Sequence, residues 1–356
     1  MLIENEATNL ITFSEEFDNA AWAKIRSTVS ADAVVAPDGT TTADKLVEDG
    51  TADSTHYARF RVAHATFTDN ANVTFSVYLK LSERTWAVVA ISTKAGTFKR
   101  AYFNLATGAV GNETVDSYGS KESEDGFRRY WITMDIGSGA TDPLFDVFLA
   151  SGDNGVTYSG DGTSDIYLWG AQVEESPVPT SYIATSGAAV TRATESGEIA
   201  MTLPPGLFDS EGTAIVYWMP SYGYGYQTAW APSGIVALRD NAISLLRNVN
   251  GAGAGRIYAN DSTVDTYSSV NYAADTWYKL CVKWGYLVGG VKKFRVGVDS
   301  GSGVSWGTEQ TFDGSYTLGT YLRLGYGLFG PMHMRQLSLF PTVLTDAEIN
   351  EWTGTP

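Results

Sequence analysis

The sequence predicts an all-β protein: two antiparallel β-sandwich (jelly-roll) domains in tandem, with a short C-terminal helix. Segments that alternate apolar and polar residues, as strands with one buried face do, recur at intervals of roughly 10 to 20 residues. No long stretch shows the 3.6-residue apolar period of an amphipathic helix. Glycine is abundant (37 residues) and charged residues are sparse (18%), which is typical of many short strands joined by turns.

Two domains are expected because a chain of 356 residues is long for a single domain. We place the first domain at residues 1–190 and the second at residues 191–356. Between their strand patterns, Pro177 and Pro179 remove backbone donors and end a strand, and a run of small polar residues leads to Thr191 and Arg192. This segment is therefore interpreted as a strap that leaves one domain and enters the next.

The first domain is predicted to be a series of strands. Residues 73–80 alternate cleanly, and the nearly continuous apolar run at residues 86–91 is typical of a central strand covered on both faces. The main predicted strands are 73–80, 86–91, 101–105, 130–136, 145–149 and 166–171.

The strand at residues 166–171 is expected to close the first domain. Ile166 and Leu168 occupy one face, whereas Tyr167 and Trp169 occupy the other. Gly170 permits a bulge or a close backbone approach.

The second domain begins a fresh series of strands and ends in a helix. Its predicted strands are 214–219, 234–238, 242–247, 256–259, 276–284, 292–298, 321–324 and 332–340. Thr345, followed three positions later by Glu348, predicts a capping box, and Ile349 and Trp352 share one face of the short helix that follows. We expect this helix to pack on the rim of the sandwich and to have no catalytic role.

Several phrases resemble segments of bacteriophage tail, fibre and head-associated proteins. In those proteins they open and close a carbohydrate-binding-module-like jelly roll. The matching phrases are Asn9 to Phe17 with Ala20-Ala21-Trp22, Ala36 to Leu46, Trp169 to Glu174, Pro179 to Ile183, and Ala189 to Arg192. The second half, with Glu211-Gly212-Thr213 near its start and Leu337 to Phe340 in its last predicted strand, resembles a concanavalin A-like (laminin G-like) lectin or glucanase domain.

The resemblance implies a non-enzymatic structural protein of a bacteriophage virion: a tail fibre, head fibre or capsid decoration protein. Such a protein acts through contacts with other virion proteins and with host surface glycans. A receptor-binding protein that recognises a host surface polysaccharide is the first alternative, and a glycan hydrolase is the second. Homotrimers are common among phage fibres, although no heptad region or β-helix repeat is visible here to enforce one.

Charge and composition exclude several other classes of function. The net charge of −16 argues against binding nucleic acid or anionic lipid without help. No apolar run approaches the length that spans a membrane, and no basic leader precedes the first strands, so we expect synthesis in the host cytoplasm and residence in the virion. The single cysteine, Cys281, excludes an internal disulfide and is expected to be buried in a strand.

The strongest candidate for a binding surface is a glycine-interleaved aromatic segment at residues 221–232. Four large rings lie close together there, at Tyr222, Tyr224, Tyr226 and Trp230. Exposed rings of this kind stack on the apolar faces of sugars or form protein–protein contacts, and both interpretations stay open.

A possible metal site lies in the loop at residues 151–165, which is rich in oxygen ligands. Asp153, Asp161 and Asp165 are the candidate ligands, because Ca²⁺ prefers carboxylate and carbonyl oxygens. The alternative is a set of ordinary Asp/Gly turns, since the spacing of an EF-hand is absent. No catalytic residues are predicted: the carboxylate phrase of concanavalin A-like glucanases is missing, and the cluster at Glu122, Glu124 and Asp125 is typical of a solvated turn.

Overall fold

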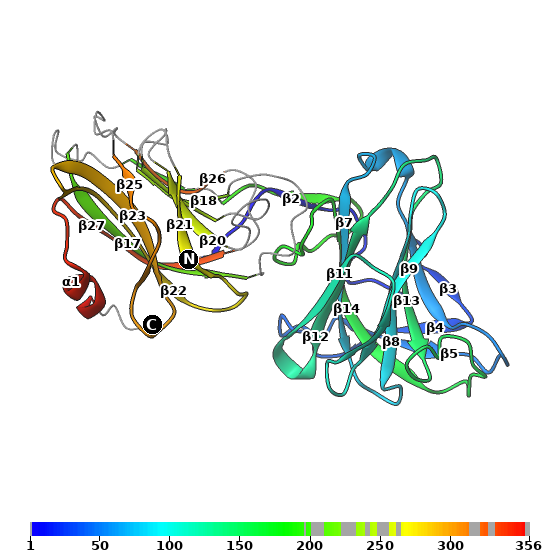
Figure 1. The fold of residues 1–356 in the computed structure, drawn as a ribbon. Coiled ribbons are helices and arrows are strands. Elements are labelled where there is room, and N and C mark those ends of the chain that lie inside the picture. The colour runs from blue at the N-terminus through cyan, green and yellow to red at the C-terminus, as the bar shows by residue number, and fades with distance from the viewer. Residues whose placement is uncertain are drawn as a thin grey trace. The chain divides into compact units, whose positions relative to one another are not determined.

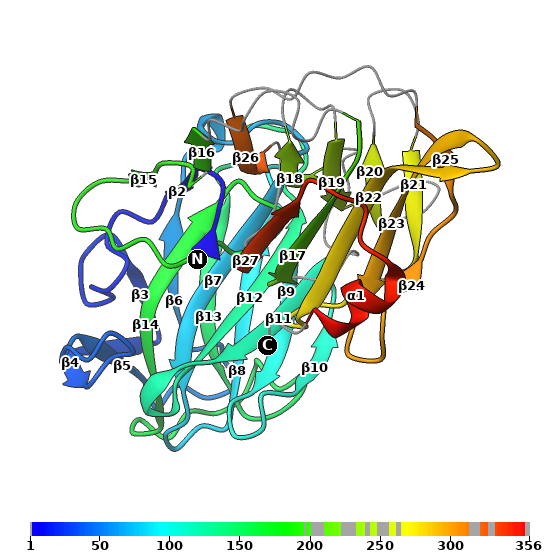
Figure 2. The same ribbon diagram turned by 90° about the vertical axis from the view of Figure 1, so that its left-hand side faces the viewer.

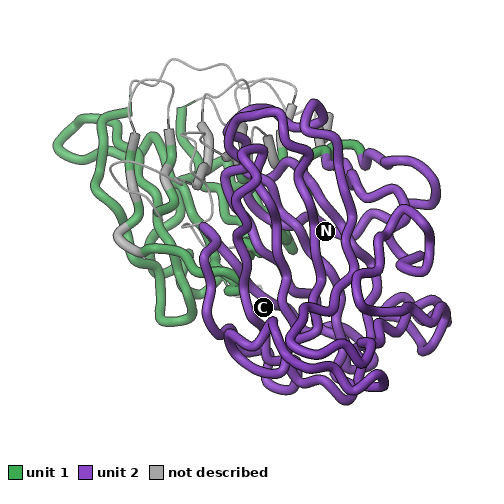
Figure 3. Tube along the Cα trace, turned by 90° about the vertical axis from the view of Figure 1, so that its right-hand side faces the viewer, with its two compact units in different colours: residues 1–6, 193–356 green, residues 7–192 purple. Residues whose placement is uncertain are grey.

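The computed structural model describes residues 2–195, 197–200, 210–221, 233–238, 243–247, 256–260, 265–312, 321–326 and 332–352. The chain divides into two compact units (Figure 3). Unit 2 is Ala7–Arg192, and unit 1 combines Met1–Glu6 with Ala193–Pro356. The boundary expected after residue 190 therefore lies after residue 192, and the first six residues belong with the C-terminal part of the chain instead of with the N-terminal one.

Unit 2 is built around two large antiparallel sheets, which we call the β8 sheet and the β7 sheet (Figures 1 and 2). The β8 sheet has the order β10 (Val110–Glu113), β9 (Phe98–Asn104), β8 (Trp86–Ser92), β13 (Leu144–Ala150), β6 (Tyr57–Arg61) and β3 (Ala23–Ile25). The β7 sheet has the order β11 (Ser117–Glu122), β12 (Arg128–Asp135), β7 (Asn72–Lys80), β14 (Asp165–Glu174), β5 (Ala43–Glu48) and β4 (Ser27–Val34). Two 3₁₀ turns, His64–Thr66 and Glu124–Gly126, lie between strands.

The core of unit 2 forms between these sheets because alternate residues of each strand point inward. Val89 of β8, Phe75 of β7 and Val147 of β13 are fully buried members of this core. The intervening residues of β8, such as Val88 and Ala90, are also buried but belong to a separate cluster on the other face of their sheet. The expectation that residues 86–91 form a central strand covered on both faces is thus confirmed.

Strand β14 places its residues as the sequence predicted. Ile166 and Leu168 lie in the core, whereas Tyr167 and Trp169 contact a cluster on the outer face of the β7 sheet. Gly170 has a φ of +61°, and the pairing of β14 with β7 shifts between Trp169 and Gln172. This is the predicted bulge, and it lets the strand continue to Glu174, beyond its expected end.

The two ends of unit 2 pair with each other. β2 (Ala7–Asn9) and β15 (Val190–Arg192) form a two-stranded antiparallel sheet, and the hydroxyls of Thr8 and Thr191 hydrogen-bond at 2.8 Å. The chain therefore enters and leaves unit 2 at one place.

Unit 1 is also built from two antiparallel sheets (Figures 1 and 2). One has the order β1 (Leu2–Ile3), β27 (Met332–Phe340), β17 (Gly212–Pro220), β22 (Tyr278–Val288), β23 (Val291–Asp299) and β24 (Ser305–Trp306), with β25 (Gln310–Thr311) also paired to β23. The other has the order β16 (Gly197–Ala200), β26 (Tyr321–Tyr326), β18 (Ser233–Leu238), β19 (Ile243–Arg247), β20 (Arg256–Asn260) and β21 (Asp265–Asn271). Ile3, Trp218 and Trp284 are fully buried in its core.

The predicted helix is α1 (Asp346–Glu351), and its capping box is confirmed: the Thr345 hydroxyl accepts from the Glu348 amide, and the Glu348 carboxylate accepts from the Thr345 amide. Ile349 is fully buried against Ile215 and Cys281, which point away from the unit 1 core. The helix thus covers the outward face of β17 and β22, not the rim of the sandwich. Cys281 is buried as expected, and burial raises its pKa to about 12, so its thiol stays protonated.

The all-β prediction is confirmed: in the described part of the chain, α1 is the one α-helix among many antiparallel strands. No helix among the described residues has the length and apolar character needed to cross a membrane.

Candidate functional site

The four aromatic residues predicted as a binding surface, Tyr222, Tyr224, Tyr226 and Trp230, lie outside the described residues. The three aspartates proposed as calcium ligands, Asp153, Asp161 and Asp165, lie in unit 2.

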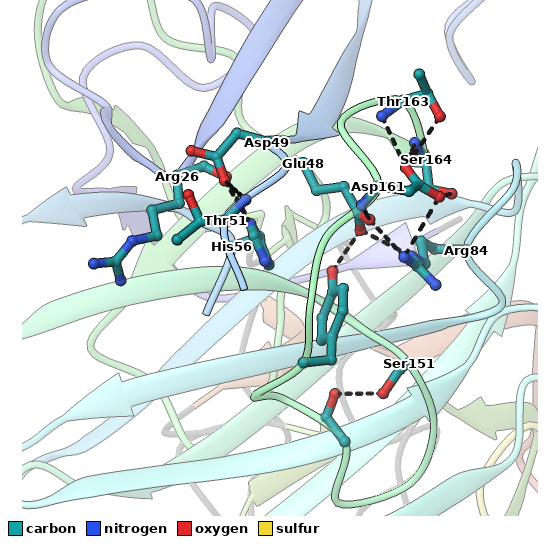
Figure 4. A network of polar contacts seen from close by, with 12 residues as sticks. Arg26, Glu48, Asp49, Thr51, His56, Arg84, Ser151, Asp161, Thr163 and Ser164 are labelled. Atoms are coloured by element: carbon teal, nitrogen blue, oxygen red, sulfur yellow. Dashed lines mark hydrogen bonds and ion pairs between the residues drawn. The ribbon is translucent and has the colours of Figure 1, made fainter. Parts of the chain in front are cut away.

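Asp161 is held in a turn by its own loop (Figure 4). One carboxylate oxygen accepts from the amides of Thr163 and Ser164 at 2.8 and 2.7 Å, and the other accepts from the Ser164 hydroxyl at 2.6 Å. These hydrogen bonds from Ser164 and Thr163 hold the pKa of Asp161 well below its usual range. The oxygens that were expected to bind Ca²⁺ are thus engaged in an Asx-type turn.

The same loop is anchored on the buried carboxylate of Glu48 (Figure 4). Glu48 accepts from Arg84 Nε at 2.8 Å, from the Tyr158 hydroxyl at 2.6 Å and from the Asp161 amide at 2.8 Å. A buried carboxylate that accepts from Arg84, Tyr158 and the Asp161 amide is electrostatically satisfied and anchors the loop.

The other two predicted ligands lie in different environments. Asp153 accepts from the Asn112 amide at 2.8 Å, whereas Asp165 is fully buried and forms an ion pair with Lys45. Within the described ranges, no group of three or more His, Cys, Asp or Glu side chains is arranged to hold a metal ion. The structure does not bring the three aspartates together.

His56 is fully buried beside this network. Its Nδ1 lies 2.8 Å from the carbonyl oxygen of Arg26, and its ring packs against Tyr158 with 4.9 Å between centroids. A Cβ on Gly160 would lie 2.9 Å from the imidazole, so a glycine is needed where the loop crosses the ring.

A cavity of about 520 Å³ in unit 2 is lined by five carboxylates, at Glu15, Glu16, Asp18, Asp32 and Asp44. Asp44 accepts from the amides of Phe17 and Asp32 at 2.8 and 3.0 Å, and its burial raises its pKa to about 6. Burial also raises the pKa of Glu15, which accepts from the Tyr182 hydroxyl at 2.9 Å. The hydrogen bonds of Asp44 therefore have a structural role, because they join the loops that contain Phe17 and Asp32.

A different surface of unit 2 gathers large rings and arginines: the outward face of the β8 sheet. The strand register aligns two rows across β6, β13, β8 and β9. One row is Tyr57, Phe148, Val88 and Tyr102, and the next is Arg59, Asp146, Ala90 and Arg100. We call this surface the ring face; it also includes Arg61, Trp86, Phe98, Leu144 and Ala150.

The rings differ in how far they reach solvent. Tyr102 and Phe148 are buried and, with Val88, form the floor. Tyr57 and Trp86 are partly buried against this floor, and Phe98 is 37% exposed. The face therefore offers aromatic surface at several depths instead of one isolated side chain.

A buried ion pair fixes the polar centre of the ring face. Arg59 donates to Asp146 through Nε at 2.8 Å and through Nη2 at 2.7 Å, and Asp146 is fully buried. The Arg59 guanidinium also lies over the rings of Tyr57 and Phe98, at 4.8 and 5.5 Å from their centroids. Since a bidentate pair fixes the plane of the guanidinium, the donors of Arg59 are held ready for a ligand.

Rings that stack on apolar faces, next to oriented donors, are the usual elements of a saccharide site. The nearly continuous apolar run at residues 86–91 indicated that this strand has a second apolar face, but sequence reasoning missed the site because the partner strands and their register were unknown.

Comparisons with known proteins assign no family. No protein-family model matches the sequence, and no curated protein matches it. Among solved structures, a similar chain is the mouse laminin alpha1 chain, domains LG4-5, with 9% sequence identity, 89% of this chain and 93% of that chain covered, and a TM-score of 0.23. A similarity this weak supports no conclusion about function, and the fold class rests on the strands described above.

Proposed function

We propose that this protein is a non-enzymatic structural component of a bacteriophage virion, such as a tail fibre, head fibre or capsid decoration protein, and that it binds a saccharide through the ring face. The virion setting is supported by the sequence phrases at residues 9–22, 36–46 and 169–192. Other virion proteins are its proposed partners in assembly, and a homotrimer is its proposed oligomer.

The observation that carries saccharide binding is the composition of the ring face. Phe98, Trp86 and Tyr57 offer partly exposed aromatic surface, on which the C–H faces of a sugar ring can stack. The guanidinium of Arg59, oriented by Asp146, supplies donors for hydroxyl groups beside that surface. A ligand on the host surface would make the protein a receptor-binding component of the particle.

A protein partner within the virion is the second candidate for this face. Aromatic residues and arginine are enriched in protein–protein interfaces, and the ring face contains both. The two functions are compatible in one fibre, and they are separated by what the isolated protein binds.

The test measures the binding of the purified protein to immobilised bacterial surface polysaccharides, for the wild type, Phe98→Ala and Trp86→Ala. We expect saturable binding that each substitution weakens about fivefold, because stacking of a sugar on one ring is worth about 1 kcal/mol. Tyr118→Ala is the matched control: this ring is 36% exposed but lies on β11 of the other sheet, and its loss should leave binding unchanged.

Three results would contradict the proposal. If the variants bind like the wild type, the ring face is not the saccharide site. If the protein binds capsid or tail proteins alone, only the structural role remains. Release of new reducing ends from the bound polysaccharide would show that the protein is an enzyme.

A further inference from the structure

We infer that the ring face selects acidic saccharides, whose carboxylate groups pair with arginines at the two sides of the aromatic floor. This inference rests on the proposed function and adds the chemical class of the ligand. Three observations carry it: the local charge, the unpaired arginines and their positions in the sheet.

The charge of the ring face is opposite to that of its unit. Unit 2 contains 24 acidic and 14 basic side chains, a net charge of −10. The outward positions of β6, β13, β8 and β9 instead hold Arg59, Arg61 and Arg100 against a single carboxylate, Asp146. A basic face on an acidic unit attracts an anion to this place and repels it from the rest of the surface.

The single carboxylate of these positions, Asp146, is already paired with Arg59. Asp146 is fully buried and is neutralised by Arg59, so it offers no charge to a ligand. Among the described residues, no carboxylate lies within ion-pair distance of Arg61 or Arg100, although Asp142 and Asp146 respectively influence them at longer range. Arg61 and Arg100 therefore keep their donors available, and a guanidinium matches a carboxylate through two parallel hydrogen bonds.

The two arginines lie on opposite sides of the floor. Arg61 is on β6 and Arg100 is on β9, with β13 and β8 between them. Neighbouring strands are about 4.8 Å apart, so the two strands lie about 14 Å apart. Several linked sugars are needed to span that distance over the rings, which favours a polymer with repeated carboxylates over a single acidic sugar.

The experiment compares matched polymers that differ only in charge. Binding of the full-length protein is measured to polygalacturonate, alginate and hyaluronan, and to each polymer after methyl esterification of its carboxyl groups. Dextran sulfate serves as a polyanion without carboxylates. We expect at least one acidic polymer to bind at least tenfold more tightly than its ester, with affinity that falls as salt rises.

Arg100→Gln and Arg61→Gln remove one charge each without touching the buried Arg59–Asp146 pair. We expect each variant to weaken binding of the acidic polymer at least fivefold while binding of the ester stays the same. Arg128→Gln, which removes an arginine paired with Glu122 on the other sheet, is the control and should bind like the wild type. The thermal unfolding of every variant is measured to show that unit 2 stays folded.

Each other outcome overturns the inference. Equal binding of acid and ester, or unchanged binding by Arg100→Gln and Arg61→Gln, would reject charge selection yet leave saccharide binding standing. Dextran sulfate that binds as tightly as every carboxylated polymer would reject selection of carboxylates. Binding of no polysaccharide by the wild type would reject this inference together with the saccharide function.

Discussion

Asp44 shows how one buried carboxylate organises two loops of unit 2. Its oxygens accept the amides of Phe17 and Asp32, and Asp32 has a φ of +53°, which L-residues adopt only with support. Burial raises the pKa of Asp44 to about 6, although these hydrogen bonds oppose the shift. Asp44 therefore holds these two loops together, although burying its charged carboxylate at neutral pH is unfavourable.

This pKa predicts a dependence of stability on pH. The native state binds a proton at Asp44 below about pH 6, whereas the unfolded chain does so near the ordinary value of 3.8. The stability that Asp44 contributes is thus complete below pH 3.8 and is lost as the pH rises through about 6, by up to about 3 kcal/mol in total. Hydrogen exchange of the peptides that contain Phe17 and Asp32, measured between pH 4 and pH 7, should show this change.

Asp44→Asn should abolish that pH dependence and lower stability, because the amides of Phe17 and Asp32 donate to different oxygens of Asp44 and asparagine replaces one of these oxygens with a donating NH2 group. Asp125→Asn is the control: Asp125 is exposed in a turn with a φ of +55°, a conformation that asparagine tolerates. If the stability of Asp44→Asn depends on pH as that of the wild type does, a group other than Asp44 causes the dependence.

Among single residues, local patterns were predictable and distant contacts were not. The positions of Ile166 and Trp169 on opposite faces follow from strand periodicity alone. By contrast, Arg59 and Asp146 are 87 residues apart in sequence, and only the register of β6 on β13 brings them together. Asp161 was recognised as a residue of interest, but its partners Thr163 and Ser164 make it a turn residue.

Helix α1 is an element whose stability depends on Thr345, the capping residue that precedes it. An isolated helix of six residues is too short to be stable in water, so it depends on its cap, on the burial of Ile349 and on the pairing of Asp346 with Arg295. Because the capping box needs residues only three positions apart, the sequence alone sufficed to predict it. The face on which the helix packs could not be predicted, since it depends on the neighbouring strands.

Thr345→Ala should destabilise this helix by about 1 kcal/mol, because the Glu348 amide loses its acceptor. Faster hydrogen exchange of the Ile349 amide would report the loss, and Thr345→Ser should restore slow exchange since it keeps the hydroxyl. Equal protection in wild type and Thr345→Ala would mean that packing alone holds the helix.

At the scale of the whole chain, unit 1 is assembled from both ends of the described sequence. β1 pairs with β27, and Ile3 is fully buried among residues more than 200 positions away. Close contacts join the two places where the chain enters and leaves: the Glu6 amide donates to Thr194 Oγ1 at 2.9 Å, and the Glu195 amide donates to the Glu4 carbonyl at 2.8 Å. The sequence could not reveal this arrangement, because residues 2–3 are too few to show a strand pattern.

We expect unit 1 to fold when residues 7–192 are replaced by a short Gly-Ser link, because its own contacts hold residues 6 and 194 together. Circular dichroism and a cooperative thermal transition would measure this. Removing residues 1–6 as well is the control, and it should lower the transition temperature because the core loses Ile3. A linked unit 1 that does not fold would show that it needs unit 2.

Unit 2 is inserted in the sequence of unit 1, and its two ends are joined by the pairing of β2 with β15. Its entry and exit strands lie side by side, so the chain enters and leaves unit 2 at neighbouring positions. A chain built this way can exchange the inserted unit for another while unit 1 keeps its own hydrogen bonds, and a different unit can then be acquired without redesigning the scaffold.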